Sequence, residues 1–165
     1  MARAQLVVEE LKKCGITHVV WLPDSETKYM YDALVATPEL SLVPVCREGE
    51  SFAIAAGLYL GGKNPAVLIQ NTGFLESGDA LRGTVLALKM PLLVMIGYRG
   101  YHGMLAGKKP VDTAAVYTEP ILKAWGLPYY LVDTDQDVGN ISLAYKEARE
   151  TSQPVVALIG REYAS

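Results

Sequence analysis

The segment REGESFAIAAGLYLGGKNPAVLIQNTG, residues 47–73, shows how this chain builds its fold. Its first half, residues 48–60, is rich in helix-forming residues and is followed by Gly61 and Gly62, which predicts a helix that ends at glycine. Its second half, residues 66–70, is a short apolar run and predicts a buried strand. A helix that leads directly into a buried strand is typical of α/β proteins.

The same alternation continues on both sides of this segment. Strands that are apolar on both faces and separated by helices are typical of a parallel sheet. We therefore expect an α/β fold, a doubly wound, mostly parallel six-stranded sheet with helices on both faces. The other predicted helices are residues 2–14, 25–36, 77–88, 113–125 and 135–150, and the other predicted strands are residues 18–22, 41–45, 91–96, 129–132 and 154–159.

The composition favours one compact domain, residues 1–165, because half of the residues are apolar and 20% are charged. No stretch approaches the roughly 20 apolar residues of a membrane span, and the N-terminus lacks a secretion signal, so we expect a cytoplasmic protein. Cys14 and Cys46 lack CxxC spacing and have only His18 and His102 as possible companions. We interpret them as reduced cysteines rather than as a zinc or redox site, and we expect no metal site made by this chain alone.

Several function classes lack their sequence motifs. The chain has no GxGxxG after a strand, no GxxxxGK[ST], no GxSxG and no HExxH. A net charge of −3 argues against nucleic-acid binding. Residues 80–111, however, contain five Lys or Arg and no acidic residue. That interval is either a solvated basic face or a rim that attracts a small anion.

Four segments follow predicted strands at the edge where open α/β sheets bind ligands. They are residues 23–25 (PDS), 46–50 (CREGE), 70–74 (QNTGF) and 97–112. The last is about sixteen residues long with four glycines, which is long for a connection in such a fold and favours a functional or mobile loop.

The second of these segments places Glu48 at the start of the predicted helix. A glutamate there commonly complements the helix dipole. Here it is followed nine residues later by Gly57 across an alanine-rich helix, and then by a strand and the sequence Thr72-Gly73. This stretch resembles the pyrimidine-binding domain of thiamine diphosphate enzymes.

Four ordered segments narrow the resemblance to the 2-oxo acid decarboxylases that act on sulfopyruvate and phosphonopyruvate. They are LPDSETK (22–28), EGESFAIAAGLYLGGK (48–63), IQNTGFLESGDAL (69–81) and MIGYRG (95–100). In this family the diphosphate and its Mg²⁺ are held by a domain with a GDG motif, which this chain lacks. The resemblance therefore implies the alpha subunit of a split decarboxylase, which shares thiamine diphosphate with a beta subunit that carries the GDG domain and the Mg²⁺.

The implied reaction is the decarboxylation of a small anionic 2-oxo acid, such as sulfopyruvate to sulfoacetaldehyde and CO₂, or of phosphonopyruvate. This chain is also expected to form a homodimer or a higher oligomer, and no nucleic-acid or membrane partner is expected. Two alternatives stay open. One is a thiamine diphosphate carboligase or ketol transferase, and the other is a non-catalytic domain that binds a small anion as a regulator.

The resemblance also assigns roles to residues. Glu48 is the catalytic residue that hydrogen-bonds the pyrimidine N1′ and favours the imino tautomer, whereas Glu50 points elsewhere on the helix. The other candidates are also ordinary cap, turn or loop residues. The cofactor-binding candidates are Glu48, Asn71, Thr72, Gly73 and Pro23, and the substrate-binding candidates are Asp24, Ser25, Gln70, Arg99 and His102.

Overall fold

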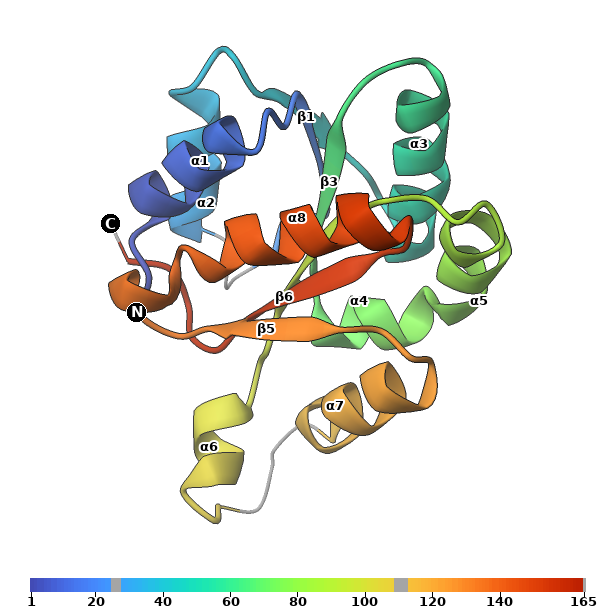
Figure 1. The fold of residues 1–165 in the computed structure, drawn as a ribbon. Coiled ribbons are helices and arrows are strands. Elements are labelled where there is room, and N and C mark those ends of the chain that lie inside the picture. Colours follow the sequence, from blue (N-terminus) through green and yellow to red (C-terminus); the bar gives the residue numbers. More distant parts are fainter. Residues whose placement is uncertain (25–27, 109–112, 165) are drawn as a thin grey trace.

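The computed structural model describes residues 1–24, 28–108 and 113–164. Within these ranges six parallel strands form one sheet in the order β2-β1-β3-β4-β6-β5 (Figure 1). All residues of β3, β4 and β6 are buried, whereas the edge strands β2 and β5 are partly exposed. The predicted fold class is confirmed. The strands are β1 (His18–Trp21), β2 (Ser41–Pro44), β3 (Pro65–Gln70), β4 (Leu93–Gly97), β5 (Tyr129–Val132) and β6 (Val155–Ile159).

Helices cover both faces of the sheet. Successive strand residues point to opposite faces, so Val19 packs in one core cluster and Val20 in the other. The first cluster lies under α1 (Ala4–Lys13), α2 (Lys28–Val35) and α8 (Asn140–Thr151). The second lies under α3 (Glu48–Leu60), α4 (Asn71–Glu76), the π-helix η1 (Leu81–Leu86) and α7 (Ala114–Ala124). The short helices α5 (Gly78–Ala80), α6 (Tyr101–Leu105) and η2 (Asp135–Asp137) complete the chain.

The structure corrects two of the predicted elements near the ligand-binding edge. The segment QNTGF, which consists largely of typical turn residues, is helical from Asn71, where α4 begins directly after β3. The region predicted as one helix, residues 77–88, is helical over residues 78–86 but is divided into α5 and the π-helix η1. The long loop 97–112 contains α6, which lies beyond the end of β4 in Figure 1. Helix α4 begins at Asn71, whose side-chain amide donates hydrogen bonds to the backbone of Arg99 and to Thr118.

Two smaller differences concern element ends. Strand β4 begins at Leu93 rather than at Pro91, and the predicted helix 135–150 is divided into η2 and α8. No helix in the described part of the chain is both long and apolar enough to cross a membrane.

Candidate active site

The carboxyl end of the sheet has two places where neighbouring strands send the chain to opposite faces. After β1 the chain runs to α2, whereas after β3 it runs to α4 on the other face. After β4 it runs to α7, whereas after β6 it returns to the face of α1, where Tyr163 is buried. Ligands of open α/β sheets bind at such reversals. We call them the β1/β3 switch point and the β4/β6 switch point.

Glu48 lies beside the β1/β3 switch point, because β2 leads into α3 and is paired with β1. Its side chain lies against Gly73 in the first turn of α4. A Cβ atom placed on Gly73 would be 2.6 Å from both Cδ and Oε1 of Glu48, which only glycine permits. The Glu48 side chain is half-buried, and among the described residues its carboxyl group has no hydrogen bond or ion pair. Its carboxyl oxygens are therefore available to a ligand.

Glu76, at the end of α4, holds the backbone on both sides of Glu48. Its Oε1 accepts a hydrogen bond from Arg47 Nε at 2.5 Å, and its Oε2 accepts one from the backbone N–H of Gly49 at 3.1 Å. The first backbone N–H groups of a helix have no partner within the helix, so a carboxylate stabilises them. Glu76 thus fixes the start of α3 and, with it, the position of Glu48.

Glu50 has a different local role. Its Oε2 accepts a hydrogen bond from the backbone N–H of Cys46 at 3.3 Å, so its side chain reaches back over the start of α3. It is also more exposed than Glu48. The geometry therefore favours Glu48 over Glu50 as the carboxyl group that faces the switch point.

The residues after β3 are connected to their surroundings by side-chain hydrogen bonds. Thr72 Oγ1 donates to Gln70 Oε1 at 2.9 Å. Asn71 is fully buried, and its Nδ2 donates to the carbonyl oxygen of Arg99 at 3.1 Å and to Thr118 Oγ1 at 3.2 Å. Its amide thus joins α4 to the end of β4 and to α7. The predicted cofactor contacts of Asn71 and Thr72 stay predictions.

The segment after β1 lies at the same switch point. Pro23 is exposed and Asp24 is half-buried, whereas Ser25 lies outside the described residues. Arg99 is exposed, and its backbone is the acceptor for Asn71. The structure therefore brings Glu48 and Gly73 into contact and connects the backbone of Arg99 to this region.

His102 is placed elsewhere, at the β4/β6 switch point. Its Nε2 lies 2.7 Å from Asp133 Oδ1 and 2.9 Å from Arg161 Nε, and Arg161 Nε also lies 3.2 Å from Asp133 Oδ1. The three side chains form one compact cluster. His102 comes from α6, Asp133 follows β5 and Arg161 follows β6.

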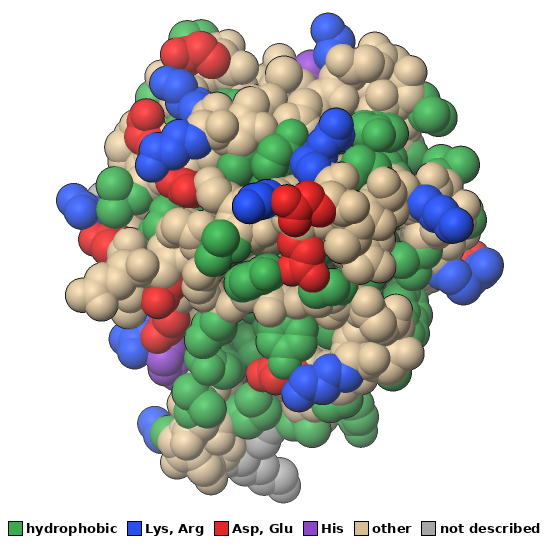
Figure 2. Space-filling model, in the orientation of Figure 1, with side chains coloured by type: hydrophobic (Ala, Val, Ile, Leu, Met, Phe, Trp, Pro, Cys, Tyr) green, Lys and Arg blue, Asp and Glu red, His purple; other side chains and the backbone are tan. Residues whose placement is uncertain are grey.

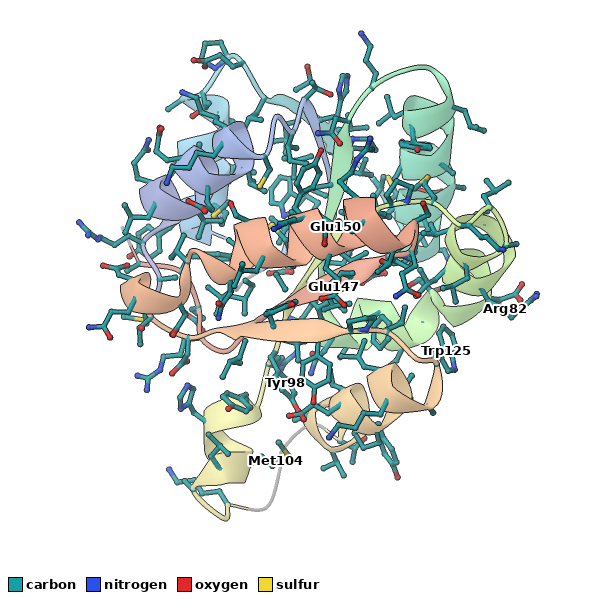
Figure 3. All side chains as sticks on the ribbon, in the orientation of Figure 1. Arg82, Tyr98, Met104, Trp125, Glu147 and Glu150 are labelled. Atoms are coloured by element: carbon teal, nitrogen blue, oxygen red, sulfur yellow. The ribbon has the colours of Figure 1, made fainter. Side chains whose placement is uncertain are left out.

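A network around Glu119 holds α7 next to this switch point. Tyr98 lies between the sheet and helices α6 and α7 (Figure 3), and its hydroxyl donates to Glu119 Oε1 at 3.2 Å. Tyr129 donates to Glu119 Oε2 at 2.5 Å, and this hydrogen bond lowers the pKa of Glu119. Burial and the nearby charge of Glu119 raise the pKa of Tyr98. These groups brace α7 and leave both tyrosines protonated at neutral pH.

Sequence reasoning missed Glu76, Asp133 and Arg161. Arg161 had a usable signal, because it follows the last predicted strand and so leaves the same edge of the sheet. One charge of the basic interval 80–111 is paired in the structure, because Arg82 forms an ion pair with Asp79, which lies just outside the interval, at 2.6 Å. In Figure 2, Lys and Arg side chains are interspersed with Asp and Glu on the face shown.

Comparisons with known proteins place this geometry in context. Residues 1–116 match the model of the family described as thiamine pyrophosphate enzyme, N-terminal TPP binding domain. The chain is similar to the sulfopyruvate decarboxylase subunit alpha of Methanococcus maripaludis, with 27% identity over 93% of this chain and 87% of that one. It is also similar to the subunit of the same name from Methanothermobacter thermautotrophicus, with 29% identity over 76% of this chain and 75% of that one.

A solved structure shows the same fold. The crystal structure of benzoylformate decarboxylase from Polynucleobacter necessarius matches with a TM-score of 0.77 at 22% identity. The match covers 100% of this chain but only 32% of that one, so this chain spans about a third of that protein.

Proposed function

This chain belongs to the thiamine pyrophosphate enzymes, and we propose that it is the alpha subunit of a split thiamine diphosphate-dependent decarboxylase. Its substrate is a small anionic 2-oxo acid such as sulfopyruvate, which yields sulfoacetaldehyde and CO₂, or phosphonopyruvate. The names and lengths of two relatives support this proposal, since this chain spans 87% and 75% of proteins called subunit alpha. We place the enzyme in the cytoplasm.

The observation that carries the proposal is the Glu48 carboxyl group, held against Gly73 and without a partner among the described residues. A carboxyl group in this state fits the ring nitrogen of an aminopyrimidine, which requires one hydrogen-bonding group that can share a proton. When bound, thiamine diphosphate would supply the nucleophilic carbon that adds to the ketone of a 2-oxo acid, and its ring would accept the electron pair left behind when CO₂ departs.

The residues of this chain have separate roles in that reaction. Glu48 holds and shares a proton at the pyrimidine nitrogen, and Gly73 leaves the room that keeps its carboxyl group in place. Pro23 and Thr72 are the proposed cofactor contacts, and the fully buried Asn71, predicted as another, supports the start of α4 beside them. Asp24, Ser25, Gln70 and Arg99 are the proposed substrate contacts, whereas His102, which was predicted as another, lies beside Asp133 and Arg161 at the β4/β6 switch point.

The diphosphate and Mg²⁺ are assigned to the beta subunit. Within the described residues no three His, Cys, Asp or Glu side chains are grouped to hold a metal ion. Helix α3 supports the presence of a partner, because it is apolar on all sides and yet Ala53, Gly57 and Leu60 are exposed. A helix of this kind is normally covered. We propose that the beta subunit covers it and that the complex forms a dimer of such pairs or a higher oligomer.

Reconstitution tests the proposal. This chain is mixed with the proposed diphosphate-binding subunit, thiamine diphosphate, Mg²⁺ and sulfopyruvate or phosphonopyruvate, and CO₂ and the products are quantified. We expect an aldehyde and CO₂ from the mixture and no turnover from either chain alone. A coupled carbon–carbon product would instead indicate a carboligase, and full turnover by one chain alone would refute the split-enzyme proposal.

A further inference from the structure

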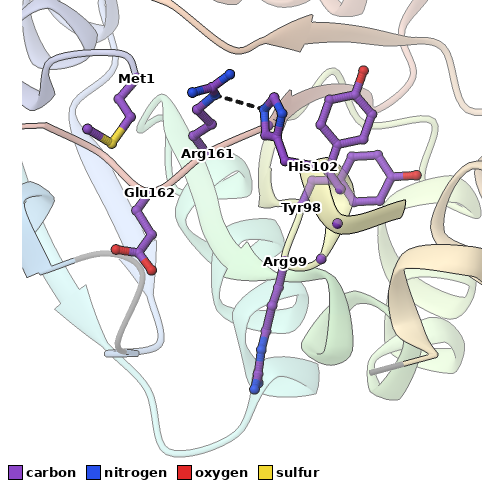
Figure 4. Close-up of a pocket in the computed structure, with 10 residues that line it drawn as sticks. Met1, Tyr98, Arg99, His102, Arg161 and Glu162 are labelled. Carbon is purple, nitrogen blue, oxygen red and sulfur yellow. Dashed lines mark hydrogen bonds between the residues drawn. The ribbon is translucent and has the colours of Figure 1, made fainter. Parts of the chain in front are cut away.

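The β4/β6 switch point contains a cavity of about 420 Å³ that is separate from the contact between Glu48 and Gly73. It is lined by the segment after β4, residues 98–103, by the segment after β6, residues 160–162, which includes the acidic Glu162, and by Met1 (Figure 4). The position satisfies the rule that ligands bind where neighbouring strands send the chain to opposite faces.

Arg161 is the cation best placed to bind a ligand in this cavity. Its Nε is directed at His102 Nε2 and Asp133 Oδ1, whereas among the described residues its two terminal nitrogens have no hydrogen bond. The guanidinium plane is thus oriented by one edge and open at the other. An open guanidinium edge binds two oxygens of one oxyanion at once.

The backbone is adapted to this arrangement. A Cβ atom on Gly160 would lie 2.7 Å from Asp133 Oδ1 and 3.2 Å from the ring of Tyr101. Glycine therefore lets Asp133 approach the end of β6, where it orients Arg161. Arg99 also lines the cavity, but its side chain extends away from Arg161 and His102 in Figure 4.

We propose that this cavity is a binding site for a small organic acid with a tetrahedral oxyanion, such as a sulfonate or phosphonate, and that Arg161 is its main recognition residue. His102 and Asp133 act as positioning residues that hold the guanidinium group. The oxyanion belongs either to the tail of the substrate or to a free effector. The substrate version rests on the proposed function, whereas the effector version does not.

The first experiment measures binding to the full chain by calorimetry. The probes are sulfoacetate and acetate, which differ by one sulfonate group. We expect Arg161→Gln to weaken sulfoacetate binding at least about tenfold and to weaken acetate binding less, because acetate lacks the sulfonate group. Arg149→Gln is the matched control, because Arg149 is also exposed and lies on α8, in a different cavity. Equal sulfoacetate affinity in the wild type and in Arg161→Gln would overturn the proposal.

The second experiment separates the two sources of the oxyanion in the reconstituted complex. If the substrate tail binds here, Arg161→Gln raises KM for sulfopyruvate and leaves kcat/KM for pyruvate, which has no second anionic group, unchanged. If a free effector binds here, both substrates keep their KM and only the response to added sulfoacetate disappears. A complex without any turnover contradicts the proposed function but not the binding site, which the calorimetry tests independently.

Discussion

Replacing Gly73 with alanine adds one methyl group at the place where Glu48 lies. The new Cβ atom would overlap with Cγ of Glu48 and lie 2.6 Å from its Cδ and Oε1, whereas non-bonded atoms need about 3.5 Å, so the Glu48 side chain must move by more than about 1 Å. Such a displacement of a catalytic group reduces turnover by about 100-fold. The fold should tolerate the change, because Gly73 lies in a helix, where alanine is favoured by about 0.5–1 kcal/mol, and the half-buried Glu48 side chain can swing outward.

The assay compares decarboxylation by the reconstituted complex with thermal unfolding of the same variant. Gly139→Ala is the matched control, since a Cβ atom there has no neighbour within 4 Å. We expect low activity with normal unfolding for Gly73→Ala, and normal activity for Gly139→Ala. Wild-type activity in Gly73→Ala would refute the proposal that the Glu48 carboxyl group, in its position against Gly73, is needed for catalysis. If Gly73→Ala unfolded at a much lower temperature than the wild type, the prediction that this substitution lowers activity without lowering stability would be wrong.

Three further predictions concern residues around the site. Glu76→Ala should lower kcat about tenfold without unfolding the chain, because the start of α3 loses the two hydrogen bonds that Glu76 accepts beside Glu48. Glu76→Gln keeps one acceptor oxygen and should therefore restore part of the rate. Asn71→Ala should lower the free energy of unfolding in urea by about 1–3 kcal/mol, because a fully buried amide with two hydrogen bonds is lost; an unchanged urea midpoint would contradict its bracing role. Hydrogen bonds lower the pKa of Glu119 from its ordinary value of 4.5 in the folded state. The ionised carboxylate therefore stabilises the fold fully above pH 4.5, and this stabilisation is lost as the pH falls through the lowered pKa. Glu119→Gln should thus cost about 1–2 kcal/mol at pH 7 and progressively less below pH 4.5, and a cost that is independent of pH would contradict this prediction.

The elements predicted correctly are those whose signals are local. Helix Glu48–Leu60 is rich in helix formers and has two glycines after it, and strand Tyr129–Val132 is a short apolar run between Pro128 and the polar segment 133–137. In both cases the predicted bounds equal the observed ones. The doubly wound sheet follows from the same alternation of short buried runs with helices.

The elements that were missed depend on distant contacts. Helix α4 begins at Asn71 because its amide bonds to the backbone of Arg99 and to Thr118, which are 28 and 47 residues away in sequence. Helix α6 is supported by the stacked rings of Tyr98 and Tyr101, whose centroids are 4.8 Å apart, and by the pairing of His102 with residues after β5 and β6. No local pattern indicates these partners.

The candidate site shows the same division. The spacing of Glu48, Gly57 and Gly73 pointed to the carboxyl group and to the glycine, but not to the contact between them. Glu76 was invisible as a positioning residue, because its partners lie 29 and 27 residues earlier in the chain. His102 was predicted as a substrate contact because it lies in the long loop after β4. In the structure its side chain lies in a cluster with Arg161, which the sequence did not indicate.

Exchange of the C2 proton of thiamine diphosphate with solvent deuterium probes most directly whether the Glu48 carboxyl group activates the cofactor. It is followed by NMR after rapid quenching of the reconstituted complex, in the wild type and in Glu48→Gln, with bound cofactor and thermal unfolding measured on the same samples. We expect exchange in Glu48→Gln to be slower by at least about 100-fold, with the fold intact and cofactor still bound. Exchange at the wild-type rate in that variant would show that this carboxyl group does not activate the cofactor.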